Sequence, residues 1–219
     1  LQSMGSVYLK SADIKLVSMD DKDTKYLNSI YQRVIKENEL LFGPMAYPKF
    51  YIIKDAAPFF FSLPGEQYFF SLGLFTKYLK HEELLVSVLV GEMIKSHRNL
   101  YRKNIIIPVG YYNTEKMLYL TRLPLDVRVE VNKWAFYSMK RAGHDAMAYL
   151  NWLQTQNKNT LDFLLQFGDP QSISKEEFLF KNFIIAENGQ FRNNIRKEVN
   201  SSGPFYKLIN DLKKVGIDI

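Results

Sequence analysis

The stretch LLVSVLVGEMIKSHRN, residues 84–99, sets the tightest limit on how this chain can fold. Its first seven residues are almost all apolar, and a helix that is apolar on every side must be buried. We therefore expect a helix over residues 81–99 at the centre of the molecule. Gly91 follows the apolar run, although glycine costs about 1 kcal/mol relative to alanine inside a helix. This glycine indicates a constraint other than helix propensity.

The composition favours one domain with a sizeable core, since 47% of the 219 residues are hydrophobic. No run of about 18 apolar residues is present, so no membrane span is expected. The absence of cysteine excludes disulfides, thiolate zinc sites and cysteine nucleophiles. Residues 1–6, LQSMGS, are expected to be a remnant of a cloning vector that replaces any native signal or lipid anchor.

Periodicity and turn residues predict an α+β fold that is mainly helical and has a small mixed sheet. Short aromatic segments at 49–55 and 67–72 are expected to be strands on either side of the turn at 63–65. The remaining expected elements are helices at 23–41, 72–80 and 81–99, a strand or buried loop at 104–109, and helices from 125 to the end, with breaks at 142–143, 168–170, 188–189 and 202–204. We expect one domain over 7–170, with a helical C-terminal extension, 171–219, packed on it.

The chain is basic, with 29 Lys and Arg against 23 Asp and Glu and a net charge of +6. These charges alternate instead of forming blocks, so no nucleic-acid partner is expected. One local concentration stands out, and it consists of Lys95, His97, Arg98, Arg102 and Lys103. It is either the solvated end of a helix, where cations suit the helix dipole, or a weak binding patch for nucleic acid or another acidic surface.

Common catalytic motifs are absent: there is no G-x-S-x-G, no glycine-rich phosphate loop, no H-E-x-x-H and no EF-hand loop. The three histidines, His81, His97 and His144, are isolated from one another in sequence. His81 precedes two glutamates, an arrangement that is more typical of a helix start than of a metal site.

Two blocks of the sequence resemble the HtpX-like and BepA-like zinc metallopeptidases, a family of the gluzincin type. The first block, 59–97, has the turn Leu63-Pro64-Gly65, then Gly73-Leu74, then Glu82-Glu83-Leu84-Leu85 leading into 91–95. The second, 128–148, ends in Ala142-Gly143-His144-Asp145, as the family's third-ligand helix does. The resemblance implies a minigluzincin-like metallopeptidase fold over residues 24–153.

The resemblance also implies that the zinc ligands are lost. Gly91 and Lys95 stand where the family has the two histidines of His-Glu-x-x-His, and Arg128 stands where it has the ligand glutamate. Asn132 replaces the following aspartate, and only Glu92 is retained. Glu130 is two residues from the ligand position, about 200° around a helix. These residues imply a former active site without zinc or another cofactor.

Two explanations for Gly91 remain open together. Loss of the histidine would leave Glu92 to be neutralised by Lys95 and Arg128 in a buried cluster of ion pairs. Gly91 would also permit close packing against an aromatic side chain such as Phe69 or Tyr111.

The favoured hypothesis is a catalytically inactive metallopeptidase, or pseudopeptidase, that binds a protein or extended peptide through the remnant cleft. The resemblance places the rim of that cleft at Ser62, Leu63, Pro64, Gly65 and Gln67, where a strand edge can pair with a peptide. It also favours an extracytoplasmic location. The alternative is a hydrolase with a relocated site, built from Glu92 or Glu130 with His97 or His144.

Overall fold

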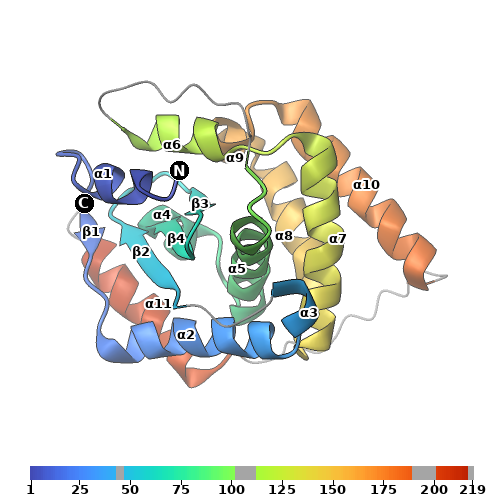
Figure 1. Ribbon diagram of the computed structural model, residues 1–219, viewed down its shortest axis with the longest axis horizontal. Coiled ribbons are helices and arrows are strands. Elements are labelled where there is room, and N and C mark those ends of the chain that lie inside the picture. Colours follow the sequence, from blue (N-terminus) through green and yellow to red (C-terminus); the bar gives the residue numbers. More distant parts are fainter. Residues whose placement is uncertain (43–46, 102–111, 189–200, 217–219) are drawn as a thin grey trace.

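Helix α5 (Glu82–His97) lies at the centre of the protein, between a small sheet and a group of helices (Figure 1). The computed structural model describes residues 1–42, 47–101, 112–188 and 201–216. Strand β3 contacts α5 on one side, while α7 and α8 pack on the other. All seven residues from Leu84 to Val90 are buried, so the predicted central, buried helix is confirmed.

Within the described residues, the sheet is mixed and has four strands in the order β1-β2-β4-β3. Strand β1 (Leu16–Val17) is antiparallel to β2 (Lys49–Ile53), and β2 is parallel to β4 (Gln67–Ser71). Strand β3 (Phe60–Leu63) is antiparallel to β4 and forms a hairpin with it around the turn at 64–66. The predicted α+β class, mainly helical with a small mixed sheet, is confirmed.

The pairing of the strands differs from the prediction. The partner of β4 across the Leu63-Pro64-Gly65 turn is β3, which the sequence did not distinguish, and not the strand at 49–53. All four residues of β3 are buried, so the strand lacks the alternation of apolar and polar residues that marks a half-exposed strand. Gly65 has φ +82°, a conformation that glycine adopts without strain, and this suits the hairpin turn.

The helices on the N-terminal side are shorter than expected. Helix α2 (Asp21–Lys36) begins at the cap residue Asp20, whose carboxylate accepts a hydrogen bond from the Asp23 N–H. The predicted helix 23–41 is divided in two, because α2 ends at Lys36 and α3 (Glu39–Phe42) follows it. Two short helices, α1 (Met4–Leu9) and α4 (Leu72–Lys77), pack near the sheet. The segment 104–109 lies outside the described residues.

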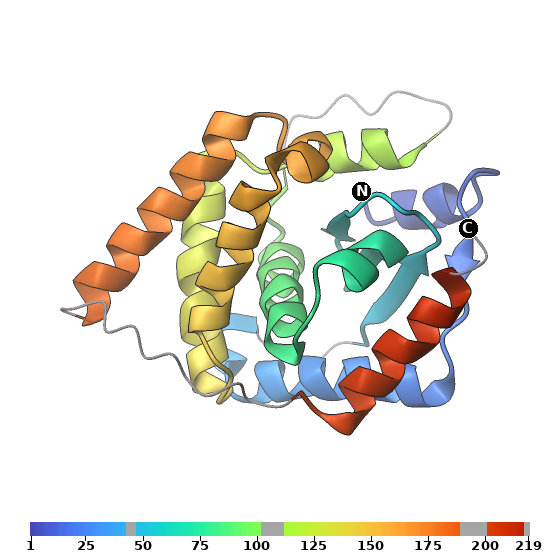
Figure 2. The same ribbon diagram turned by 180° about the vertical axis from the view of Figure 1, so that it is seen from behind.

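In the part of the chain that the structure describes, six helices follow: α6 (Thr114–Thr121), α7 (Leu125–Arg141), α8 (Met147–Lys158), α9 (Thr160–Phe167), α10 (Pro170–Asn188) and α11 (Gly203–Gly216). Helix α10 packs on α7, α8 and α9, while α11 packs on α2 and α4. These last two helices therefore lie on opposite sides of α5 (Figure 2). None of the helices described is long and apolar enough to cross a membrane.

Helix α11 is attached to α2 by charge. The Lys207 ammonium lies 2.8 Å from the carboxylates of Asp20 and Asp211 and 2.9 Å from that of Asp23. Hydrogen bonds from Lys207 and Lys214 lower the pKa of Asp211 to about 2, and the bond from Lys207 is the main cause of the lowered pKa of Asp20. These contacts join the C-terminal helix to the start of α2.

This cluster predicts a pH-dependent stability. The pKa of Asp211 is lower in the folded chain than its ordinary value of about 4, so its stabilising effect is complete above about pH 4 and is lost as the pH falls toward 2. Lys207→Met should therefore lower the melting temperature above pH 4, and the difference from the wild type should shrink toward pH 2. Lys213→Met, an exposed change on the same helix, is the control. If Lys207→Met lowers the melting temperature by the same amount at every pH, this explanation is contradicted.

Candidate functional site

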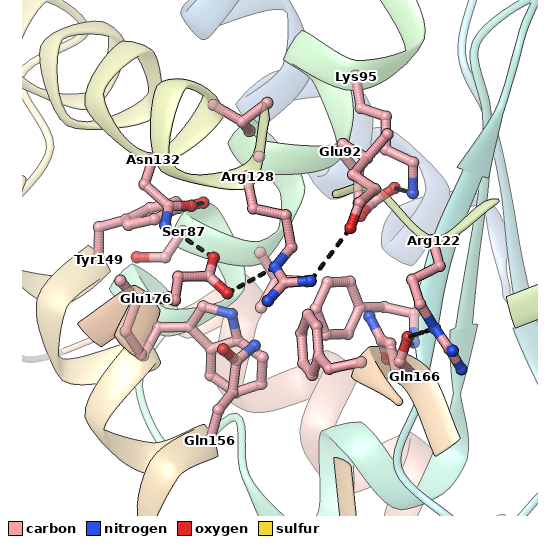
Figure 3. A pocket seen from close by; sticks show the side chains of 18 of the residues that line it. Ser87, Glu92, Lys95, Arg122, Arg128, Asn132, Tyr149, Gln156, Gln166 and Glu176 are labelled. Carbon is pink, nitrogen blue, oxygen red and sulfur yellow. Dashed lines mark hydrogen bonds and ion pairs between the residues drawn. The ribbon is translucent and has the colours of Figure 1, made fainter. Parts of the chain in front are cut away.

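The five residues expected at the former active site line one pocket (Figure 3). Gly91, Glu92 and Lys95 come from α5, while Arg128 and Asn132 come from α7. In each helix the outer positions are four residues apart, so they lie on one face about one turn from each other. The pocket has a free volume of about 70 Å³. Helices α8, α9 and α10 complete it through residues such as Tyr149, Gln166 and Glu176.

Glu92 is neutralised by Lys95. The Lys95 ammonium lies 3.1 Å from Glu92 Oε2, and each side chain is only 8% exposed. Both belong to one helix at positions i and i+3, a spacing at which side chains meet. The predicted pairing of Lys95 with Glu92 is confirmed. A carboxylate held in this way beside an ammonium is already charge-balanced without a metal.

The prediction that Arg128 also neutralises Glu92 is wrong, because Arg128 forms its ion pair with Glu176 of α10. Arg128 Nε lies 2.7 Å from Glu176 Oε2, and both side chains are buried. The guanidinium also donates to the Leu123 carbonyl at 3.1 Å and to Ser172 Oγ at 3.2 Å. Its centre lies 5.1 Å from the centroid of the Phe167 ring. The guanidinium is therefore satisfied by groups from three segments.

Glu176 is a site residue that the sequence reasoning missed. Its second oxygen accepts a hydrogen bond from the Asn132 amide at 2.8 Å, so it bridges the two α7 residues, Arg128 and Asn132, that were expected at the site. Glu176 is 44 residues from Asn132 in sequence, beside a second buried glutamate, Glu177. Acidic residues are mostly exposed, so nothing local in the sequence marked Glu176 as a buried residue of the site.

Gly91 makes room for Tyr149 of α8. A Cβ atom at Gly91 would lie 3.0 Å from the Tyr149 hydroxyl, which is closer than ordinary van der Waals contact. That hydroxyl donates to Asn132 Oδ1 at 2.8 Å. Burial, together with the charges of Glu176 and Glu92, raises the pKa of Tyr149 well above 10, so it remains a neutral donor. The prediction that Gly91 permits close packing against an aromatic side chain is therefore confirmed, and the aromatic residue is Tyr149.

The aromatic partner of Gly91 was named incorrectly, since Phe69 belongs to the separate apolar cluster that includes Tyr8 and Phe61. The other residue that was named, Tyr111, lies outside the described residues.

These residues do not fit a catalytic zinc ion. A zinc site of this type needs about three nitrogen, sulfur or oxygen ligands and an open position for water. Gly91 offers no side-chain ligand atom, and Lys95 and Arg128 place cations at the other two positions where the resemblance led us to expect ligands. The carboxylates of Glu92 and Glu176 are each already paired with one of these cations. No metal step is therefore derived for this pocket.

The expected rim of the cleft is mostly turned inward. Ser62, Leu63 and Gln67 are buried, while Pro64 and Gly65 reach the surface. The Ser62 hydroxyl donates to the Glu92 carbonyl at 3.2 Å, and the Gln67 amide donates to the carbonyls of Gln2 and Pro64 at 3.0 Å. Gln2 precedes α1, so residues of the expected vector remnant pack against this turn.

Among the described strands, β3 forms one edge of the sheet. Its residue Phe60 lines the pocket, so this edge lies next to it. The Phe60 N–H donates to Gln166 Oε1 at 3.2 Å, so this backbone group of the edge is already occupied by a side chain of α9.

The residues of the alternative site are not brought together. Glu130 pairs with Lys133 at 2.6 Å near the surface, with its own side chain 59% exposed. The His97 ring contacts Glu66 at 2.9 Å and the Phe42 carbonyl at 3.1 Å. His144 lies 3.2 Å from Glu83. Neither Glu92 nor Glu130 has a histidine as its ion-pair partner among the described residues.

The basic patch is also divided by the fold. Lys95 and His97 are directed inward to acidic partners, and Arg98 is exposed. Arg102 and Lys103 lie outside the described residues. A cluster of three acids elsewhere, Asp20, Asp23 and Asp211, already surrounds the Lys207 ammonium.

No family model matches this chain, and no curated protein matches it in a sequence search.

The pair of Arg128 with Glu176 predicts strong coupling. Glu176→Leu should lower the free energy of unfolding by about 3–5 kcal/mol, because it leaves a buried guanidinium without its counter-charge. Arg128→Met should cost a similar amount, and the double variant should recover part of the loss. Urea unfolding of the four proteins gives the coupling energy. The exposed Glu130 and Lys133 pair on α7 is the matched control and should couple by about 1 kcal/mol or less. If the losses of unfolding free energy in Glu176→Leu and Arg128→Met simply add in the double variant, the predicted coupling of the two residues is contradicted.

Proposed function

We propose that this protein is a catalytically inactive relative of the HtpX-like and BepA-like metallopeptidases, and that it binds a protein or peptide partner. The proposal combines the resemblance of two sequence blocks with the geometry of the pocket. The observation that carries it is that all five positions aligned with the family's catalytic centre line a single pocket, although they come from α5 and α7, more than 30 residues apart. An accidental sequence match gives no reason for this convergence.

The chemistry of these positions supports an inactive site. Hydrolysis by this class depends on a metal-bound water, which a glutamate deprotonates. Here the retained Glu92 is paired with Lys95, and ion pairs occupy the neighbouring positions. Selection for binding instead of catalysis would tolerate these replacements. The proposed location outside the cytoplasm rests on the resemblance alone.

Zinc content and the behaviour of Glu92 test the proposal. Protein purified without chelator should contain far less than one zinc per chain and should not cleave casein. Glu92→Gln should lower the free energy of unfolding by about 3–5 kcal/mol, because it strands the buried Lys95 ammonium. A hydrolase that uses Glu92 makes the opposite forecast: the variant keeps its melting temperature and loses its activity. Stoichiometric zinc that survives dialysis would also reject the proposal.

Rebuilding the metal site tests the family relationship directly. A variant with Gly91→His, Lys95→His and Arg128→Glu restores the family's three ligand types, and Tyr149→Phe removes the hydroxyl next to the new histidine. If the two helices hold the family's geometry, this protein should bind about one zinc per chain. The single variant Tyr149→Phe is the control and should bind none.

Circular dichroism identifies rebuilt proteins that remain folded. If the full variant does not fold, the pair Lys95→His with Arg128→Glu supplies two ligands and should bind zinc more weakly. A folded rebuilt protein with no more zinc than its control would contradict the proposed relationship.

A further inference from the structure

The pocket is lined by a buried amide, Gln156 of α8, that has no protein partner. The residue is only 2% exposed, yet neither the oxygen nor the nitrogen of its side chain bonds to another residue in the described ranges. Figure 3 shows Gln156 among the residues around Arg128. Buried polar groups are normally hydrogen-bonded, and leaving one unpaired destabilises the folded state. Both the acceptor and the donor of this amide are therefore available to a molecule in the pocket.

Two further N–H donors line the same space. Trp152, one turn before Gln156 on α8, is also 2% exposed, and its indole N–H has no partner in the part of the chain that the structure describes. Gln166 of α9 accepts a hydrogen bond from the Phe60 N–H through its Oε1, while its Nε2 bonds to none of the described residues. A ligand can thus be bound by donors from three side chains and by the Gln156 carbonyl.

The cations of the lining are already engaged. Two of them form buried ion pairs, Lys95 with Glu92 and Arg128 with Glu176. The third, Arg122, donates to two backbone carbonyls of α9 at 2.7 and 3.0 Å. An ion that entered the pocket would lose its hydration without gaining a free counter-charge from the described lining, and this costs far more than burying a neutral polar group. The pocket therefore favours an uncharged ligand.

Size restricts the ligand further. A free volume of about 70 Å³ is far below the roughly 300–1,000 Å³ of pockets for drug-sized ligands. A water-sized group occupies roughly 10–15 Å³ by this kind of measure, so the space accepts a few non-hydrogen atoms. Gly91 and Arg122, which line the pocket, are partly exposed, so it is not sealed from solvent.

A carboxamide group meets these requirements. It is uncharged, and it carries an acceptor oxygen next to an amino group with two N–H donors. Such a group can pair head to head with Gln156, donating to its Oε1 and accepting from its Nε2. The second lone pair of the ligand oxygen can then accept from Trp152 or Gln166. A ketone of the same shape has no donor and would leave the Gln156 carbonyl unpaired.

We infer that this pocket binds a carboxamide group through Gln156, Trp152 and Gln166, and that the group is either a free small amide or an asparagine or glutamine side chain of a peptide. The peptide form rests on the proposed function, in which the former catalytic cleft holds a partner. The binding of the amide group itself does not depend on the family relationship.

The two tryptophans of the chain provide a direct test by nuclear magnetic resonance. ¹⁵N-labelled protein is titrated with acetamide and with two molecules of the same shape, acetone, which lacks the donor, and sodium acetate, which is charged. The Trp152 indole signal, assigned with Trp152→Phe, should shift and saturate with acetamide, and at least tenfold higher concentrations of the other two should be needed. Trp134, which is 48% exposed and does not line the pocket, is the internal reference and should not move.

Each of the other results overturns the inference. No saturable shift with acetamide would mean that the pocket holds only water. Equal affinity for acetone would remove the role of the Gln156 carbonyl, and equal affinity for acetate would remove the preference for an uncharged group.

A pair of blocked tripeptides distinguishes the two sources. N-acetyl-Ala-Gln-Ala-methylamide is compared with the same peptide that has methionine in place of glutamine. Tighter binding of the glutamine peptide than of acetamide identifies a peptide side chain, and weaker binding identifies a free amide. Both results support the carboxamide site. If the methionine peptide displaces acetamide as well as the glutamine peptide does, the inference is overturned.

Matched variants connect the signal to Gln156. Gln156→Met keeps an unbranched side chain of similar size and should weaken acetamide binding about tenfold, because it removes the head-to-head hydrogen bonds. Gln154→Met makes the same change on α8 outside the pocket and should leave the affinity unchanged. The dispersion of the amide signals shows which variants are folded, and Gln156→Leu replaces Gln156→Met if the latter is not. Unaltered affinity in the folded variant would overturn the assignment. Zinc binding by the wild type would reject the proposed function without bearing on this result.

Discussion

The burial of α5 on all its sides is the constraint on which the rest of the structure depends. A helix with apolar residues around its whole circumference has to be covered by several partners. Here the sheet, α2, α7 and α8 cover it. The same helix carries Glu92 and Lys95 into the interior, so the elements that bury the apolar residues also enclose these charges. Packing and site are therefore properties of one helix and cannot be altered independently.

Much of this arrangement was predictable from local patterns. The central helix and the class of fold followed from apolar runs and turn residues, which depend on residues close in sequence. The convergence of residues 91–95 with 128–132 was expected from the family resemblance and not from local patterns. The hairpin between β3 and β4 was missed because a fully buried strand has no alternating pattern. Helix ends, such as that of α2 at Lys36, depend on tertiary contacts and were predicted less accurately.

The partners in the site were harder to predict than its members. Lys95 and Glu92 share one helix, so their contact follows from helical geometry. The contact of Arg128 with Glu176 joins α7 to α10. The spacing of residues within α7 does not indicate which face of a later helix packs against Arg128. Tyr149 beside Gly91 is a similar case. A glycine in a buried helix indicates that something approaches closely, but it does not identify the neighbour.

The contact between Arg128 and Glu176 also has a dynamic consequence. Helix α10 cannot separate from α7 without leaving one buried charge on each side, and it would also expose the core residues Phe180 and Ile184. Partial opening at this end of the chain is therefore costly, and the amide hydrogens of α10 are expected to exchange together with those of α7 as a single cooperative unit. The pocket then opens or closes with that unit, and its slowest motion is a local unfolding event rather than the movement of a single side chain.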